Sequence, residues 1–376
     1  MKMRRTVLLL ICVIFALSCA CAEGISGTRK LHGDGAHMLA LDSMGRVWAW
    51  GSNHSGESAP EDEKTDILAP VHVFSGASQI AAGQNFSMAL DDSGRLFMWG
   101  ANKRGQIYGF TGDKTAECVS VMENVSMIDA CDERALALTK ADVIVWGAGE
   151  EEKRFEADAV KAALGVDFVL ILTSGGEVYE YSLETGKGEC LLSGAKDIDA
   201  SGQSRYAVTT NGDVFSWGAN GTEGRIGLPE TYDWAETPVK MQITGVDFIR
   251  SGLTGGCAVK DTGEMFVWGS IYSYMTAFDE NGEEAASLVE GEIVHYGNTP
   301  IALYEGVSDA AFADAAIAVL FENGDVFTWG SNDHGQIGNG TITETRLVHG
   351  EEEGEYDIEV ASFFQQIFPA RPITLE

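Results

Sequence analysis

Short apolar strands alternate with Gly-containing turns along the chain, and the same pair of strands recurs seven times. Each copy has a first strand rich in Ala, Val and Leu, a turn such as DDSGR (91–95), and a second strand that ends in Trp-Gly in six copies. Alternation along the second strand places Leu96 and Met98 on one face and Phe97 and Trp99 on the other. Because both faces are apolar, we expect each such strand to lie between two neighbouring sheets.

The spacing of the copies predicts the fold. The seven anchors at the end of the second strand are 35 to 61 residues apart and are Trp50, Trp99, Trp146, Tyr181, Trp217, Trp268 and Trp329. A period near fifty with two short strands per signature is typical of propellers. The sequence therefore predicts an all-β protein, a seven-bladed β-propeller of four-stranded antiparallel blades, over residues 23–350.

One unit illustrates the expected blade. Residues 76–83 form the first strand, 85–91 the second and 94–100 the third, and a segment around a Pro-Val pair, such as 69–73 or 237–241, forms the fourth.

Ring closure is expected to use a shared blade. Residues 28–51 would supply three of its strands, and the segment around Arg346, Leu347 and Val348 would supply the fourth. Residues 351–376 remain as a C-terminal tail, either an extra edge strand or a cap.

The N-terminus is typical of an export signal. Three basic residues within positions 2–5 precede an apolar stretch, residues 7–17, and an A-x-A cleavage pattern at residues 20–22. Eleven apolar residues are too few to span a bilayer, which needs about 20. We expect residues 1–22 to be a signal peptide and the protein to be secreted or attached to the cell surface; the alternative is a lipoprotein anchored at Cys19.

The net negative charge of the chain argues against one class of binding partner, nucleic acids. The formal net charge is −32, with 57 acidic and 25 basic residues. Nucleic-acid binding draws much of its affinity from Lys and Arg contacts to phosphate, so this composition argues against a nucleic-acid partner. Two interpretations stay open: a solubilising surface and a surface that attracts a basic partner.

Polar side chains with catalytic or metal-binding potential form no recognisable constellation. The seven histidines match no nucleophile or zinc motif. His54 and His334 fall in equivalent loops, and we interpret them as isolated loop histidines, with a shared metal as the alternative. Residues 279–284 are acidic but lack calcium-loop spacing. Beyond residue 22 the four cysteines fit no zinc pattern and allow one disulfide at most. We expect no catalytic residue, no metal and no cofactor.

Four segments carry a family resemblance: WGSNHSGE (50–57), WGANKRGQIYG (99–109), WGANGTEGRIG (217–227) and WGSNDHGQIGNGT (329–341). With the Ala-Leu strands before them, they resemble the regulator of chromosome condensation repeat family over residues 28–350. Copy three lacks the Asn-x-x-Gly loop and copy four has Tyr181-Ser182 instead of Trp-Gly, so those blades are expected to be trimmed. The resemblance implies a seven-bladed propeller.

The resemblance leaves function open. Nuclear members act as nucleotide exchange factors on a small GTPase, through loops with no match here, and exported members look like protein-binding propellers, one of whose uses is β-lactamase inhibition. We expect an exported, monomeric module that binds a protein. A carbohydrate- or cell-wall-binding module is the alternative, followed by an exchange-like regulator or an enzyme.

The expected binding site is aromatic. If strands alternate in direction, the connections after Trp-Gly lie on one side of the ring, and the two longest are residues 228–236 and 271–296. Tyr and Trp are favoured anchors at interfaces. The candidate partner-binding residues are Tyr232, Trp234, Tyr272, Tyr274, Phe278 and Tyr296.

Overall fold

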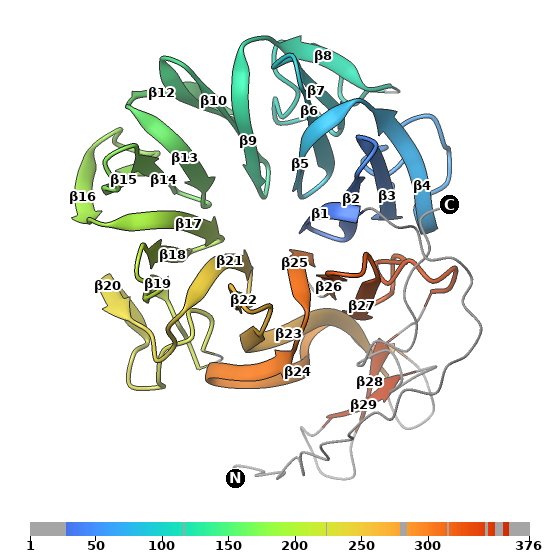
Figure 1. The fold of residues 1–376 in the computed structure, drawn as a ribbon. Helices are drawn as coiled ribbons and strands as arrows, with labels where there is room; N and C mark the ends of the chain where they lie inside the picture. Colours follow the sequence, from blue (N-terminus) through green and yellow to red (C-terminus); the bar gives the residue numbers. More distant parts are fainter. Residues whose placement is uncertain are drawn as a thin grey trace.

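Seven antiparallel sheets surround a central axis, which confirms the all-β, seven-bladed propeller (Figure 1). The structure is a computed structural model. It describes residues 28–115, 117–222, 224–278, 284–313, 316–342, 345–349 and 356–360, with the backbone alone for residues 28–29, 271–278, 284–295, 345–349 and 356–360. No helix occurs in these ranges. The expected signal peptide with Cys19, and all but the last residue of the acidic segment 279–284, lie outside them.

In each blade the strand that comes first in the sequence lies nearest the axis (Figure 1). The first three blades contain β1 (Thr28–Asp34), β2 (His37–Asp42), β3 (Arg46–Ser52), β4 (Asp66–Ser75), β5 (Ala77–Gly83), β6 (Phe86–Asp91), β7 (Leu96–Gly100), β8 (Val119–Met122), β9 (Val125–Cys131), β10 (Arg134–Thr139), β11 (Asp142–Gly147) and β12 (Glu150–Glu156).

The fourth to seventh blades follow the same order. They contain β13 (Ala159–Leu164), β14 (Phe168–Thr173), β15 (Val178–Ser182), β16 (Gly188–Leu192), β17 (Ala195–Ser201), β18 (Ser204–Thr209), β19 (Val214–Ala219), β20 (Trp234–Lys240), β21 (Val246–Gly252), β22 (Gly255–Lys260), β23 (Met265–Phe278), β24 (Glu284–Tyr304), β25 (Val307–Ala313), β26 (Ala316–Phe321) and β27 (Val326–Gly330). Two further strands, β28 (Thr345–His349) and β29 (Tyr356–Val360), end the described chain.

The third strand of a blade buries both of its faces, as the alternation predicted. Leu96 and Met98 are fully buried in a cluster that includes Ile128 of the third blade. Trp99, on the opposite face, is fully buried in a cluster that includes Leu39 of the first blade. The hydrophobic core is therefore distributed between the blades.

The tryptophans of the Trp-Gly pairs donate their indole N–H groups to the preceding blade. In four cases the acceptor is the backbone carbonyl seven or eight residues after that blade's own tryptophan. These pairs are Trp50 with Gln336, Trp99 with Glu57, Trp146 with Gln106 and Trp268 with Arg225, at 2.8–3.0 Å. A buried indole N–H needs a partner, so each of these tryptophans depends on the loop of its neighbour.

The asparagine of the Trp-Gly loop holds that carbonyl in place. Asn102 Nδ2 donates to Phe110 O at 3.0 Å and Gly112 O at 2.7 Å, and its Oδ1 accepts the Ile107 N–H at 2.7 Å. Gly105 supplies the left-handed turn inside the loop, at φ 73°. Asn53, Asn220 and Asn332 make equivalent contacts in their own loops.

Blades three and four are trimmed, as predicted, but both keep four strands. A two-residue turn, Ala148 and Gly149, joins β11 to β12, and both residues have positive φ (53° and 72°). Five residues, 183–187, join β15 to β16. These two blades therefore lack the Asn-containing loop after the third strand but keep a complete four-stranded sheet.

The predicted insertion 271–296 is not an irregular loop. It extends the outer hairpin of the sixth blade, because β23 and β24 stay paired from Met265 opposite Tyr304 to Phe278 opposite Glu284. The first strand, β23, is rich in β-branched and aromatic residues, which favour a pleated sheet.

The predicted closure by a shared blade is wrong. The first blade takes its fourth strand, β4, from the chain directly after β3, and the seventh blade has three strands in the described part. The segment around Arg346 instead forms β28, which pairs in parallel with residues 276–278 at the extended end of β23. That extension offers a free sheet edge, and such an edge accepts a further strand. In the predicted tail, β29 pairs with β28, and residues 361–376 lie outside the described chain.

Candidate partner-binding face

One side of the ring, which we call the loop face, carries the connections from first to second and from third to fourth strands. A cavity of about 320 Å³ lies at the centre of the ring on this side. The ends of the innermost strands line it, together with the turns that follow them, including Gln84, Val166, Gly202 and Leu253. The axis of the propeller is thus hollow at the loop face.

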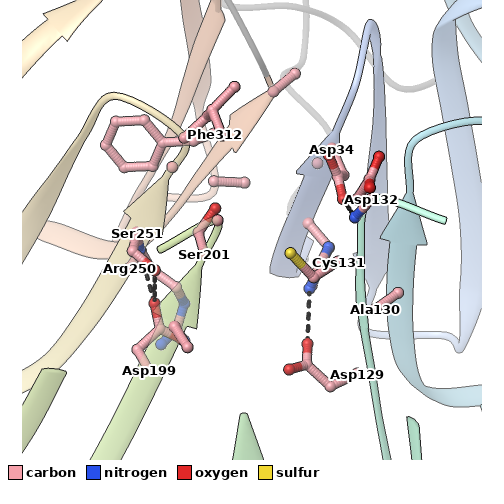
Figure 2. A pocket seen from close by; sticks show the side chains of 18 of the residues that line it. Asp34, Asp129, Ala130, Cys131, Asp132, Asp199, Ser201, Arg250, Ser251 and Phe312 are labelled. Carbon is pink, nitrogen blue, oxygen red and sulfur yellow. Dashed lines mark hydrogen bonds and ion pairs between the residues drawn. The ribbon is translucent and has the colours of Figure 1, made fainter. Parts of the chain in front are cut away.

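Side chains at equivalent places in three innermost strands hold the blades together around this cavity. His32 Nδ1 accepts the Ala82 N–H at 3.1 Å. Asp129 Oδ2 accepts the Leu164 N–H at 2.8 Å. Asp199 Oδ2 accepts the N–H and the hydroxyl of Ser251, both at 2.7 Å (Figure 2). Each acceptor satisfies a strand-edge N–H of the next blade, so these polar groups have a structural role.

The cavity is acidic. Four aspartates line it: Asp34, Asp129, Asp132 and Asp199. The lining also includes Arg250, but its Nη2 lies 2.8 Å from Asp309 Oδ1, and Asp309 is fully buried. The Arg250 charge is therefore matched by a carboxylate behind the wall, and the cavity keeps an excess of negative charge.

Burial affects one of these carboxyl groups strongly. It raises the pKa of Asp199 to about 6, although Lys161 and Arg250 favour the charged form. Asp34 and Asp132 are linked at the cavity rim, where Asp34 Oδ2 accepts the Asp132 N–H at 2.7 Å (Figure 2). The sequence interpretation missed these acids. Their signal was a polar residue in or just after an otherwise apolar innermost strand.

Two of the predicted aromatic residues are exposed on the loop face. Tyr232 is 36% exposed and Trp234 is 43% exposed. Trp234 is the first residue of β20 rather than part of the preceding connection, and it pairs with Ala219. The Arg205 guanidinium carbon lies 5.8 Å from the centre of its ring.

The remaining predicted residues belong to the sixth blade. Tyr296 packs in the core, where its hydroxyl accepts the Trp329 indole N–H, and burial raises its pKa. The backbone of Tyr272, Tyr274 and Phe278 lies in β23, and their side chains lie outside the described part. Asn298 Nδ2 of β24 donates to Thr222 O at 3.0 Å, so the loop after Trp217 in the fifth blade contacts the hairpin of the sixth blade.

Other reactive groups are buried in structural positions. His37 is fully buried with its Nε2 2.9 Å from Ser87 Oγ, and burial lowers its pKa to about 3. All four cysteines in the described chain are unpaired, and burial raises the thiol pKa of Cys131 and Cys257. These thiols are poor nucleophiles. The described residues contain no helix with the length and apolar character needed to cross a membrane.

Comparison with known proteins agrees with the geometry. The Regulator of chromosome condensation (RCC1) repeat matches residues 77–106 and 323–352. Mouse E3 ubiquitin-protein ligase HERC2 is 30% identical over 369 residues, 82% of this chain but 7% of the ligase. Drosophila melanogaster regulator of chromosome condensation is 30% identical over 161 residues, 42% of this chain and 27% of that protein. The chain therefore corresponds to a small part of these relatives.

Solved structures show the same fold. Human WBSCR16 superposes with a TM-score of 0.64 at 20% identity, over 80% of this chain and 92% of that one. Prp20p from Saccharomyces cerevisiae, reported with its binding properties to Gsp1p and histones, gives 0.64 at 17% identity over 81% and 85%. With the blades and Trp-Gly loops described above, these comparisons show that the chain is a seven-bladed β-propeller that contains regulator of chromosome condensation repeats at residues 77–106 and 323–352.

Proposed function

We propose that the chain is an exported protein-interaction module that binds a protein partner through its loop face. The observation that carries the proposal is the acidic cavity at the centre of this face, on the same side as the exposed Tyr232 and Trp234. A rigid ring that presents a recess and aromatic side chains is suited to binding a macromolecule. The similarity to Prp20p, which binds Gsp1p and histones, supports this choice.

The charge of the cavity favours a partner that presents a basic side chain. The lining holds four aspartates against one arginine, which is already paired with Asp309, and one histidine, His32, whose Nε2 lies 3.7 Å from Asp129 Oδ1. A Lys or Arg side chain entering the recess would meet this excess of carboxylates. The net charge of −32 would also accelerate the encounter with such a partner.

The aromatic contribution comes from two neighbouring blades. The hydrogen bond from Asn298 to Thr222 joins the loop that follows Trp217 in the fifth blade, the loop that also leads to residues 228–236, to the long hairpin of the sixth blade. We infer that Tyr232 and Trp234, together with Tyr272, Tyr274 and Phe278 of the hairpin, form one recognition surface. Tyr296 does not contribute an exposed ring to this surface, because its hydroxyl accepts the Trp329 indole N–H in the core.

We infer binding rather than catalysis as the activity. Cys131, the one thiol in the cavity lining, is buried, and burial holds it in the neutral form. The neighbouring carboxylates are engaged with backbone N–H groups of the next blade. Export would follow from residues 1–22, with secretion or surface attachment as the outcome.

The test uses proteins captured by crosslinking from the culture supernatant and envelope of the source cells. A variant with Trp234, Tyr272, Tyr274 and Phe278 all changed to Ala should lose the captured protein while its Tm stays within a few degrees, because interface energy is concentrated in a few aromatic anchors. Asp132→Asn should slow association and reduce its dependence on salt.

Met44→Ala is the matched control. Met44 is 67% exposed and lies in the turn between β2 and β3, on the opposite side of the ring. It should capture the partner as well as the unaltered protein does. Equal loss in both variants, or binding to purified wall glycans in place of a protein, would contradict the proposal.

A further inference from the structure

Two histidines that are 280 positions apart in the sequence lie side by side where the ring closes. His54 belongs to the Trp-Gly loop of the first blade and His334 to that of the seventh. Their ring centres are 5.4 Å apart with the rings nearly perpendicular. Asp66, the first residue of β4, lies between the same two blades.

The three side chains converge on one point. One imidazole nitrogen from each histidine and one oxygen of Asp66 all lie within 4.8 Å of one another. The closest pair is His334 Nδ1 and Asp66 Oδ1, 2.9 Å apart. Two donors bound to a tetrahedral zinc ion at 2.0–2.1 Å are about 3.3 Å apart, so this pair is already near ligand spacing.

A buried carboxylate fixes the orientation of His54. Ser52 Oγ donates its only proton to Glu57 Oε1 at 2.7 Å, and Glu57 is fully buried. The contact of 3.0 Å between Ser52 Oγ and His54 Nδ1 must then be donated by the imidazole. This tautomer leaves the lone pair on His54 Nε2 available, which is the arrangement found behind many metal-bound histidines.

The loop that carries His334 is held firmly against the first blade. Gly340 N donates to Leu68 O at 2.8 Å, and Trp50 Nε1 donates to Gln336 O at 2.8 Å. Gly335 sits so close to Leu68 that a Cβ would lie 3.1 Å from its Cα. The donor atoms are therefore positioned by backbone contacts on both sides of the junction.

We propose that His54 Nε2, His334 Nδ1 and Asp66 Oδ1 form a binding site for a divalent transition-metal ion of the zinc class. The ion would take the place of the proton that His334 shares with Asp66. Two imidazoles and one carboxylate suit Zn²⁺ and its neighbours rather than Ca²⁺ or Mg²⁺, which prefer oxygen donors. Three protein ligands leave a fourth position for water.

A bound ion would link the first and seventh blades and so stabilise the closed ring. The first and seventh blades share no sheet in the described part of the chain, so their junction depends on packing and on a few contacts between blades. An ion held by Asp66 and His334 would join residues 268 positions apart. Binding to the folded state alone raises Tm by mass action.

The experiment measures binding of Zn²⁺ alone to the purified protein by calorimetry, in millimolar Mg²⁺ that occupies the general acidic surface. One ion per chain is expected, together with a rise in Tm of about 3–6 °C at a hundredfold excess over Kd. Co²⁺ used in place of Zn²⁺ should give the visible absorption band of a tetrahedral site with nitrogen donors.

Variants separate the site from adventitious binding. His54→Ala removes one ligand but keeps the bond between His334 and Asp66. Because loss of a group behind a ligand already costs about 10–100-fold in metal affinity, loss of the ligand itself should weaken Zn²⁺ binding by at least that much without changing the Tm measured in chelator. His72→Ala is the matched control, because His72 is an exposed histidine of β4, the strand that begins at Asp66. Its ring contacts Ser75 and takes no part in the proposed site. It should bind Zn²⁺ as the unaltered protein does. Equal Zn²⁺ affinity in the unaltered protein and His54→Ala, or no saturable binding in Mg²⁺, would overturn the proposal.

Discussion

Trp217→Ala should destabilise the protein far more than Trp234→Ala, although both residues lie in the fifth blade. Trp217 is 2% exposed and packs in the cluster between blades four, five and six. Its indole N–H donates to Glu180 Oε2 of the fourth blade at 2.8 Å. Trp234 is 43% exposed and has one ring contact, with Arg205.

The magnitudes follow from burial. Truncation of a buried Trp to Ala costs about 3–5 kcal/mol, since it removes apolar contact and leaves a cavity. For a domain of this size 1 kcal/mol corresponds to roughly 1.5–2 °C, so Trp217→Ala should lower Tm by about 5–10 °C. Trp234→Ala loses an exposed cation–π contact worth about 0.5–1 kcal/mol and should lower Tm by about 2 °C or less.

A third variant isolates the hydrogen bond between the blades. Trp217→Phe keeps an aromatic ring but removes the N–H that Glu180 accepts, while Arg205 Nη2 still donates to Glu180 at 2.9 Å. Loss of a hydrogen bond to a carboxylate costs about 1.5–3 kcal/mol, so its Tm should fall between those of the other two. Thermal unfolding followed by circular dichroism measures all three, and equal shifts for Trp217→Ala and Trp234→Ala would refute the blade assignment.

Two further predictions concern pH and processing. Burial raises the pKa of Asp199 from 3.8 to about 6, so the folded state binds a proton more tightly than the unfolded chain, and this contribution to stability is lost as pH rises from about 4 to about 6. Asp199→Asn should remove that part of the pH dependence of Tm, and an unchanged profile would show that the carboxyl group is not desolvated. Intact-mass analysis of exported protein should give an N-terminus at Glu23 without lipid; a diacylated Cys19 would place the protein on a membrane.

The number of blades and their core positions could be predicted because they are local properties of the sequence. Period-two alternation identifies the buried faces of a strand such as 96–100, and the repeat of Trp-Gly counts the blades. The position of Tyr296 could not be read in this way. It lies in an insertion, and only the pairing of β23 with β24 places it against Trp329.

The candidate sites depend on residues that meet only when the ring closes. His54 and His334 were interpreted as isolated loop histidines. The sequence places them in equivalent loops, but it does not show that ring closure brings their ring centres to 5.4 Å. The cavity acids come from separate blades, and each looks unremarkable in its own strand. Contacts of this kind depend on closure of the whole propeller, which a local pattern does not encode.

Where a blade departs from the Trp-Gly pattern, the cause lies in the loop of the preceding blade. An indole N–H left without a partner in the core costs about 1–3 kcal/mol, so a Trp is suitable only where the preceding blade offers an acceptor. The third blade has a two-residue turn in place of that loop, and the fourth blade correspondingly carries Tyr181, whose ring packs 5.0 Å from Phe155. Where the preceding blade lacks the loop but Trp is kept, a side chain replaces the backbone carbonyl as acceptor of the indole N–H. Glu180 accepts from Trp217, and the Tyr296 hydroxyl accepts from Trp329. Substitutions in one blade are thus constrained by the connection of the blade before it. When a repeat loses its Trp-Gly loop, the next repeat must either replace its Trp or supply another acceptor for the indole N–H.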